Sequence, residues 1–352
     1  MDDGQVRMAS KHVLIAIIAG IISAMLSLAF VAGSAVSVFF LVYLVPLPIL
    51  LVGLGLGHRA ALIAAGAGTL ISLGLGFAGG AMFAVLHGLP SWAISFLALS
   101  KTNPAIAKNG IDVAEELPGR EADVPGLPER PRSYDAGYVK AEPYPDKGWF
   151  PAGWIIVWIA ILACIYMVAA SLLTGGGLKG AVIEYISGLF EMIAPNQDAT
   201  VRLDATKVLA DFFPGMVGAF WVLMLGVNTV FAQGLLVKGR KNLRPSPRMK
   251  ELMLPDWPSW ALVGSAALAL LGPGEIGYMG RNIFVVLVMP YFFLGLAVVH
   301  VLAGSLRFPG MLLGLIYVIT LATGWFALVI GAIGIVEQWV GLRRRIVRPM
   351  EG

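Results

Sequence analysis

Long apolar runs separated by short polar turns make up most of the first hundred residues. A helix that crosses a bilayer needs about 20 mostly apolar residues. The pattern predicts four such helices, at about 13–32, 36–57, 60–78 and 80–99. The second contains Pro46 and Pro48, which remove backbone donors, so we expect it to kink or to split into two short pieces.

The apolar pattern resumes after residue 150 and continues almost to the C-terminus. It predicts spans at about 152–173, 215–237, 259–272 and 280–303, and two closely joined helices over 309–342 that break near Thr323 and Gly324. Between the first two, polar positions at helical spacing over 178–194 predict an amphipathic helix on the membrane surface, followed by a short helix over 200–212. The predicted fold class is an all-α, polytopic transmembrane helix bundle of about 8–10 spans.

Residues 101–150 interrupt this pattern. The stretch is rich in proline and in charge of both signs and has few large aliphatic residues, so it cannot bury a core and is predicted to be a disordered loop. It divides the chain into an N-terminal membrane half, residues 1–100, and a C-terminal membrane half, residues 151–352. The second half includes the amphipathic segment 178–212.

Composition supports a membrane protein. Hydrophobic residues make up 58% of the chain and charged residues 13%, against about 25% charged residues in a typical soluble domain. The first apolar run follows Arg7 and Lys11 and is too long for a typical signal peptide, which indicates an uncleaved span.

The distribution of Lys and Arg predicts the orientation. Basic residues gather in 238–250 and at the C-terminus, whereas 174–213 carries more acidic than basic residues. Because cytoplasmic loops are enriched in Lys and Arg, we expect both termini and the 101–150 loop in the cytoplasm and 178–212 outside. The basic loop 238–250 has the composition to contact anionic lipid or RNA, and it is interpreted as a positive-inside loop with neither role.

Few residue patterns point to chemistry. Cys164 is the single cysteine, and the four histidines show no metal-ligand spacing. The sequence has no phosphate-binding loop, no HExxH and no GxSxG motif. We therefore expect no enzyme activity, no metal and no cofactor.

Four polar residues inside predicted spans are candidate ligand contacts: Asn228, Gln233, His300 and His87. Buried amides and imidazoles in membrane helices either bond a neighbouring helix or contact a ligand or ion. The sequence leaves both interpretations open.

Charged residues near span ends predict interfacial contacts. Glu337 lies about two turns before Arg343 and Arg344, next to Trp339, which predicts an interfacial ion pair rather than a group at the membrane centre. A second polar group, Glu275, Arg281 and Asn282, is expected in a mostly solvated outside turn.

Small residues form one stripe on the first span. Ala16, Gly20 and Ala24 stand at i, i+4 and i+8, a spacing that lets two helix backbones approach closely. The partner of this stripe is a helix of the same chain, a second copy of the chain, or a different subunit.

Four stretches carry a resemblance to a known family: NTVFAQGLLVKGRKNLRPSP, LMLPDWPSW, YFFLGLAVVH and IGIVEQWVGLRRR. Together they resemble the YybS-like predicted bacterial membrane proteins (DUF2232), a family with no known chemistry. That family is similar to the substrate-binding S components of energy-coupling-factor transporters. The resemblance implies a bacterial inner-membrane protein that docks a transmembrane coupling subunit through small residues on its first helix, with separate ATPases supplying energy.

Two functions follow as expectations. The first is a transporter-type membrane subunit that binds an unknown small solute and has no ATPase of its own. The alternative is an envelope scaffold or assembly protein that transports nothing and recruits partners through the 101–150 loop.

Overall fold

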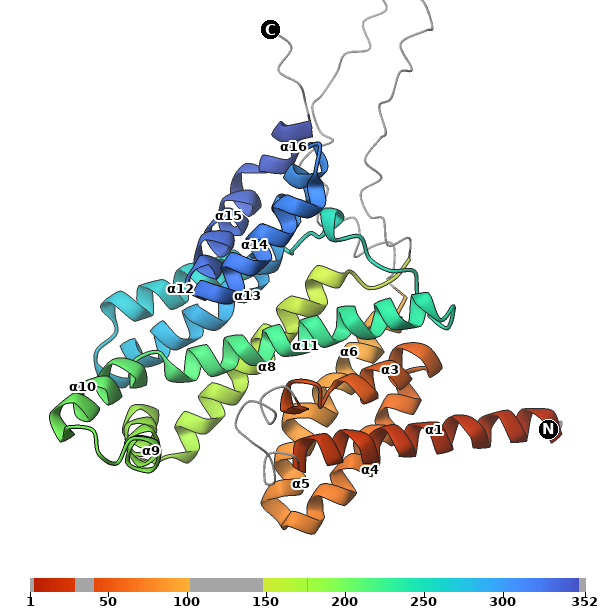
Figure 1. The fold of residues 1–352 in the computed structure, drawn as a ribbon, viewed down its shortest axis with the longest axis horizontal. Helices are drawn as coiled ribbons and strands as arrows, with labels where there is room; N and C mark the ends of the chain where they lie inside the picture. Colours follow the sequence, from red (N-terminus) through yellow and green to blue (C-terminus); the bar gives the residue numbers. More distant parts are fainter. Residues whose placement is uncertain (1–2, 29–40, 102–147, 176, 348–352) are drawn as a thin grey trace, which may run out of the picture.

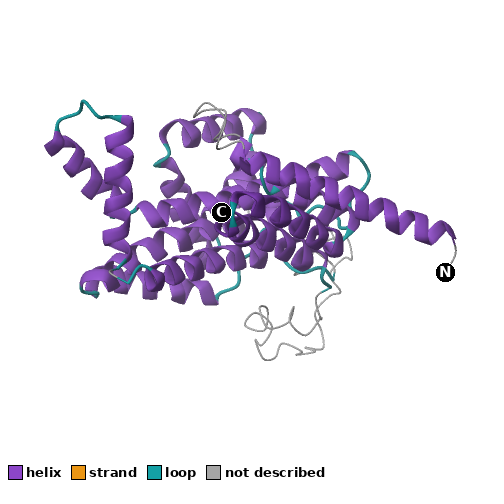
Figure 2. Ribbon diagram, turned by 90° about the horizontal axis from the view of Figure 1, so that it is seen from below, coloured by secondary structure: helices purple, strands orange, loops and turns teal. Residues whose placement is uncertain are grey.

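The computed structural model describes residues 3–28, 41–101, 148–175 and 177–347. The named elements are all helical, which confirms the predicted fold class (Figures 1 and 2). Six described helices are long and apolar enough to cross a membrane: Ser10–Leu28, His58–Leu75, Phe77–Leu99, Ala152–Leu173, Phe213–Lys238 and Gly274–Gly304. Shorter apolar helices cover Leu41–Leu56, Trp257–Leu271, Pro309–Thr323 and Phe326–Val340.

The N-terminal half packs around α1, which lies across α3 and α4 (Figure 1). Its elements are α1 (Asp3–Leu28), α3 (Leu47–Leu56), α4 (His58–Ser72), η2 (Leu73–Leu75), α5 (Phe77–Phe83), the π-helical turn η3 (Ala84–Gly88) and α6 (Leu89–Leu99). The predicted break at the prolines is present, because residues 44–46 form a turn and α3 begins at Leu47.

The helices of the C-terminal half agree closely with the apolar pattern. They are α8 (Ala152–Leu173), α9 (Leu178–Ile193), α10 (Ala199–Ala210), α11 (Phe213–Lys238), η4 (Met249–Glu251), α12 (Trp257–Leu271), α13 (Gly274–Gly304), α14 (Pro309–Thr323), α15 (Phe326–Val340) and α16 (Leu342–Val347). Gly324 separates α14 from α15 with φ +67°, a left-handed conformation that glycine adopts without strain.

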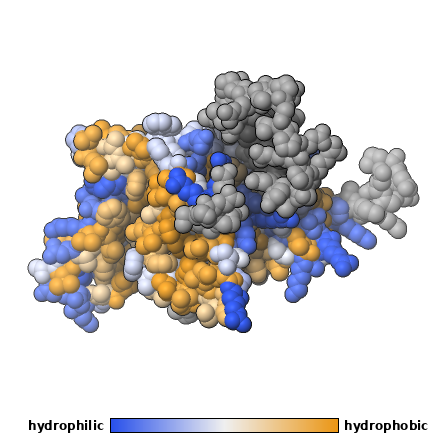
Figure 3. Space-filling model, turned by 90° about the horizontal axis from the view of Figure 1, so that it is seen from above, coloured by the Kyte–Doolittle hydropathy of each residue, from blue (hydrophilic) through white to orange (hydrophobic). Residues whose placement is uncertain are grey.

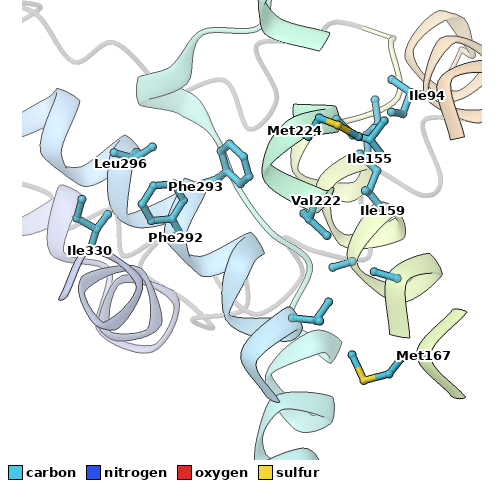
Figure 4. Packing of buried hydrophobic residues seen from close by; sticks show 14 of the residues in the cluster. Ile94, Ile155, Ile159, Met167, Val222, Met224, Phe292, Phe293, Leu296 and Ile330 are labelled. Atoms are coloured by element: carbon cyan, nitrogen blue, oxygen red, sulfur yellow. The ribbon is translucent and has the colours of Figure 1, made fainter. Parts of the chain in front are cut away.

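The core of the C-terminal half is centred on α13, which packs against α8, α11, α12 and α15. Figure 4 shows Phe292, Phe293 and Leu296 of this helix near Ile330 of α15. Gly334 allows the close approach of α15, because an added Cβ would overlap the carbonyl oxygen of Tyr291.

Side chains from both halves share one core cluster. Ile94 of α6 lies beside Ile155 of α8 and Met224 of α11 in Figure 4. The exterior is also apolar over wide areas (Figure 3). Leu172, Leu270 and Leu321 are each at least 79% exposed, as expected where lipid is the solvent.

The ends of the predicted loop 101–150 meet. Lys101 and Trp149 form an antiparallel bridge, and the Phe150 amide donates to the Ser100 carbonyl over 3.0 Å. The Lys101 ammonium lies 3.4 Å from the centroid of the Trp149 ring. The predicted disorder falls on residues 102–147, which lie outside the described residues.

One sequence prediction about a turn is wrong. Residues 275–282 belong to the first turns of α13, and Asn282 is fully buried instead of solvated. The helix starts early because Gly274, with φ +52°, lets the chain turn into it directly after Pro273.

Candidate functional site

The membrane-length helix Phe77–Leu99 is continuous but contains a π-helical turn, η3, near its middle. Pro90 has no N–H, so the Leu86 carbonyl lacks its helical donor. The Leu89 amide bonds the Ala84 carbonyl, five residues back, which leaves the Val85 carbonyl without a helical donor as well. π-helical turns are rare in proteins as a whole, and those that occur are often found at functional sites.

Two aromatic side chains of the C-terminal half supply the hydrogen-bond donors that these carbonyls lack. The Tyr166 hydroxyl of α8 donates to the Val85 carbonyl over 2.8 Å, and the Trp221 indole N–H of α11 donates to the Leu86 carbonyl over 2.9 Å. The two rings pack together with centroids 5.5 Å apart. Backbone that leaves helical geometry in a membrane needs such partners, because lipid offers none.

A carbonyl at the turn before α3 also receives its hydrogen bond from a side chain of the C-terminal half. The turn at residues 44–46 leaves the Tyr43 carbonyl without a helical donor, since Leu47 bonds Leu44 instead. The Asn228 side-chain amide donates to this carbonyl and to the Met224 carbonyl of its own helix, both over 2.8 Å. Asn228 follows Trp221 by seven residues, so both lie on one face of α11. We call this set of three contacts the junction.

Three buried polar atoms without partners belong to residues 87–92, in and directly after the π-helical turn. His87 Nδ1, Ser91 Oγ and Trp92 Nε1 are buried and have no hydrogen-bond partner among the described residues. The same is true of Asn228 Oδ1 at the junction. Natural proteins leave few such atoms unpaired, so each calls for an explanation, such as a bound molecule.

The other two candidate ligand contacts have structural partners. The Gln233 amide donates to the Arg244 carbonyl over 2.8 Å and fixes the loop after α11. His300 Nδ1 lies 2.8 Å from the Leu296 carbonyl of its own helix, and its ring packs on Tyr317. The structure brings Asn228 and Gln233 to the contacts between the two halves, since Arg244, the partner of Gln233, donates to Ala98 of α6. The His87 ring packs on Phe83 within the N-terminal half, and His300 lies elsewhere.

Arg244 is a buried charge that the sequence did not single out. It is 3% exposed, and its guanidinium donates to the Ala98 carbonyl in the last turn of α6 over 3.1 Å. A cation is favourable at a helix C-terminus, where carbonyl groups lack helical donors. Its position inside the loop 238–250 made it indistinguishable from the solvated cations around it.

The small-residue stripe of α1 is occupied within the chain. An added Cβ at Gly20 would overlap the Ala64 carbonyl oxygen of α4, and Ala16 and Ala24 are fully buried. The Ser23 hydroxyl also bonds the Val45 carbonyl. This face of α1 therefore contacts α3 and α4 rather than a surface open to another subunit.

Glu337 forms an ion pair at the end of α15. Its carboxylate accepts from the Arg343 side chain over 2.6 Å and from the Arg343 amide over 3.0 Å. Glu337 is 7% exposed. Arg344 is exposed and forms no ion pair with the described residues.

A polar cluster at the opposite end of α13 holds the surface helices in place. The Glu275 carboxylate accepts from the amides of Leu178 and Lys179 at the start of α9. The Tyr278 hydroxyl donates to the Ala210 carbonyl, and Asn282 contacts the turn between α10 and α11. The cluster is hydrogen-bonded throughout, which indicates a structural role.

Nothing in the described part of the chain suggests a metal centre, since no group of three His, Cys, Asp or Glu residues is placed to hold an ion. A family model described as a predicted membrane protein (DUF2232) matches residues 150–337. No curated protein and no solved structure matches the chain.

Proposed function

The chain belongs to the DUF2232 family of predicted membrane proteins and is a multi-pass membrane protein. We propose that it binds a small polar solute between its helices as a transporter-type subunit. The observation that carries the proposal is the group of buried, unpaired polar atoms on His87, Ser91 and Trp92, in and directly after a π-helical turn. π-helical turns inside α-helices are frequent at functional sites.

The position of His87 supports binding within the membrane. It is the eleventh of the 23 residues in Phe77–Leu99, so it lies near the middle of this helix. The pairs Val85–Tyr166 and Leu86–Trp221 hold this turn against the C-terminal half. A rearrangement between the halves would therefore act directly on the turn that carries His87.

The contacts of the proposed solute follow from the unpaired atoms. A neutral imidazole nitrogen accepts or donates according to its tautomer, the Ser91 hydroxyl does both, and the Trp92 indole donates. These three side chains fit a small molecule with both donors and acceptors, and they provide no fixed charge for a strongly ionic substrate. Asn228 Oδ1 is a separate unpaired acceptor beside Tyr43.

The resemblance implied that a coupling subunit docks on the small residues of α1. The structure does not support this docking site, because α4 covers Ala16, Gly20 and Ala24. We propose that any energy-supplying partner contacts another surface.

The test is purification of the whole protein in mild detergent, followed by mass spectrometry of bound small molecules and proteins. We expect a stoichiometric polar solute that His87→Gln loses and His300→Gln retains. The His300 variant is a matched control, because its ring nitrogen bonds its own helix. An empty ligand fraction together with co-purified envelope proteins would overturn the proposal in favour of the scaffold function.

A further inference from the structure

A group of cations gathers where the C-terminal half ends. Lys250, Arg307, Arg344 and Arg345 are exposed, and they come from the loop before α12, the turn after α13 and α16. We call these four residues the basic patch. The acids nearest in sequence have other partners, since Glu337 pairs with Arg343 and Glu251 with Arg248. None of the four forms an ion pair with a described carboxylate.

Direct contacts bring these segments together. The Arg343 guanidinium donates to the Lys250 carbonyl over 2.8 Å, which joins α16 to η4. The Lys250 ammonium lies at the end of α13, 2.6 Å from the position of a Cβ built on Gly304. Arg307 follows Gly304 by three residues. The patch is therefore set by the fold, around the ends of α13 and α15.

Tryptophans mark the membrane boundary at the same end of the molecule. Trp257 and Trp260 lie in the first turn of α12, and Trp339 lies in the last turn of α15. They are 39%, 72% and 61% exposed. Gln338 donates to Asp256 over 2.8 Å, which places these two helix ends side by side. Exposed tryptophans concentrate at the level of lipid headgroups.

We propose that the basic patch binds the phosphate groups of anionic glycerophospholipids. Cations next to membrane helices attract anionic headgroups with about 1 kcal/mol each, or about fivefold in affinity per residue. The tryptophans place the cations at headgroup depth, which favours lipid over a soluble polyanion such as RNA.

Native mass spectrometry of the whole protein in neutral detergent tests the proposal. Phosphatidylglycerol, phosphatidylcholine or a short single-stranded RNA is added, and the bound fraction is measured. We expect preferential retention of phosphatidylglycerol, reduced about 25-fold in the double variant Arg344→Gln with Arg345→Gln. Raised salt should weaken the retention as well.

The matched control is Arg240→Gln with Lys241→Gln, which removes the same charge from exposed residues at the end of α11, beside α3. Retention in this variant should match the unmodified protein. Equal loss in both double variants would show a general charge effect and overturn the proposal, as would equal binding of the two lipids or preferential binding of RNA. Melting temperatures of both variants establish that each is folded.

Discussion

Removing the Tyr166 hydroxyl should destabilise the protein only while Pro90 is present. The hydroxyl donates to the Val85 carbonyl, whose usual donor, the Leu89 amide, bonds Ala84 instead in the π-helical turn before Pro90. Alanine at position 90 restores an N–H for the Leu86 carbonyl and allows Leu89 to bond Val85. Tyr166→Phe in the Pro90→Ala background should then remove a hydrogen bond that the fold no longer needs.

The expected magnitude follows from the state of the Val85 carbonyl. Side-chain hydrogen bonds between membrane helices contribute about 0.6 kcal/mol on average and up to about 1.7 kcal/mol. The Val85–Tyr166 bond is exposed on the apolar surface, where lipid offers the carbonyl no other donor, and a polar group left without a partner costs about 1–3 kcal/mol. We expect Tyr166→Phe to lower the free energy of unfolding by about 1–1.5 kcal/mol. In the Pro90→Ala background the loss should be about 0.3 kcal/mol, a coupling of roughly 1 kcal/mol.

The assay is reversible unfolding by SDS in mixed micelles, followed by circular dichroism, for the two single variants and the double variant. Tyr317→Phe is the control, because the Tyr317 hydroxyl has no hydrogen bond within the described residues. It should change the free energy of unfolding by no more than a few tenths of a kcal/mol. An equal cost of Tyr166→Phe in both backgrounds would refute the link between Pro90 and the junction.

Three further predictions concern other parts of the molecule. Gly334→Ala should lower the free energy of unfolding by about 1–3 kcal/mol in the same SDS assay, because its Cβ would overlap backbone of α13, whereas Gly314→Ala, with open space around it, should not. Replacing residues 103–147 by a short glycine-serine linker should leave the melting temperature within a few degrees, because the flanking residues already meet; loss of bound partners but not of solute would assign recruitment to this segment. Asp198 caps α10, and its hydrogen bonds to Thr200 hold the pKa of its carboxyl below the ordinary 3.8. The cap therefore stabilises α10 fully above pH 3.8, and this stabilisation is lost as the pH falls through the lowered pKa. The protection factors of the α10 amides, which are corrected for the intrinsic exchange rate at each pH, should therefore fall in acid, and Asp198→Ala should remove this pH dependence.

The helices were predictable because length and apolar pattern determine them. The Pro46–Pro48 break and the separation of two helices at Gly324 also follow from local chemistry. The turn before α13 was mispredicted because glycine and proline in GPGEIGYMGR are typical of a loop. The partners that bury Asn282 come from α10 and α11, about 70 residues earlier in the chain.

The junction was only partly predictable. Asn228 stood out as an amide in an apolar helix, and its two possible uses could not be separated without knowing that Tyr43 lies beside it. Tyr166 and Trp221 gave no signal, because aromatic residues are common in membrane helices. The carbonyls to which they donate can be recognised as lacking a helical donor only once the π-helical turn is known.

The junction also has a consequence for how the protein is made. The carbonyls of Tyr43, Val85 and Leu86 belong to the part of the chain that is synthesised first, whereas all three donors lie beyond residue 150. Ribosomes add about 5–20 residues per second, so the first half waits for seconds in the insertion machinery with polar backbone that lipid cannot satisfy. Its final helix arrangement is reached only after α8 and α11 have entered the membrane. A nascent chain that stops before Tyr166 should therefore stay bound to the insertase, and one that extends past Asn228 should be released.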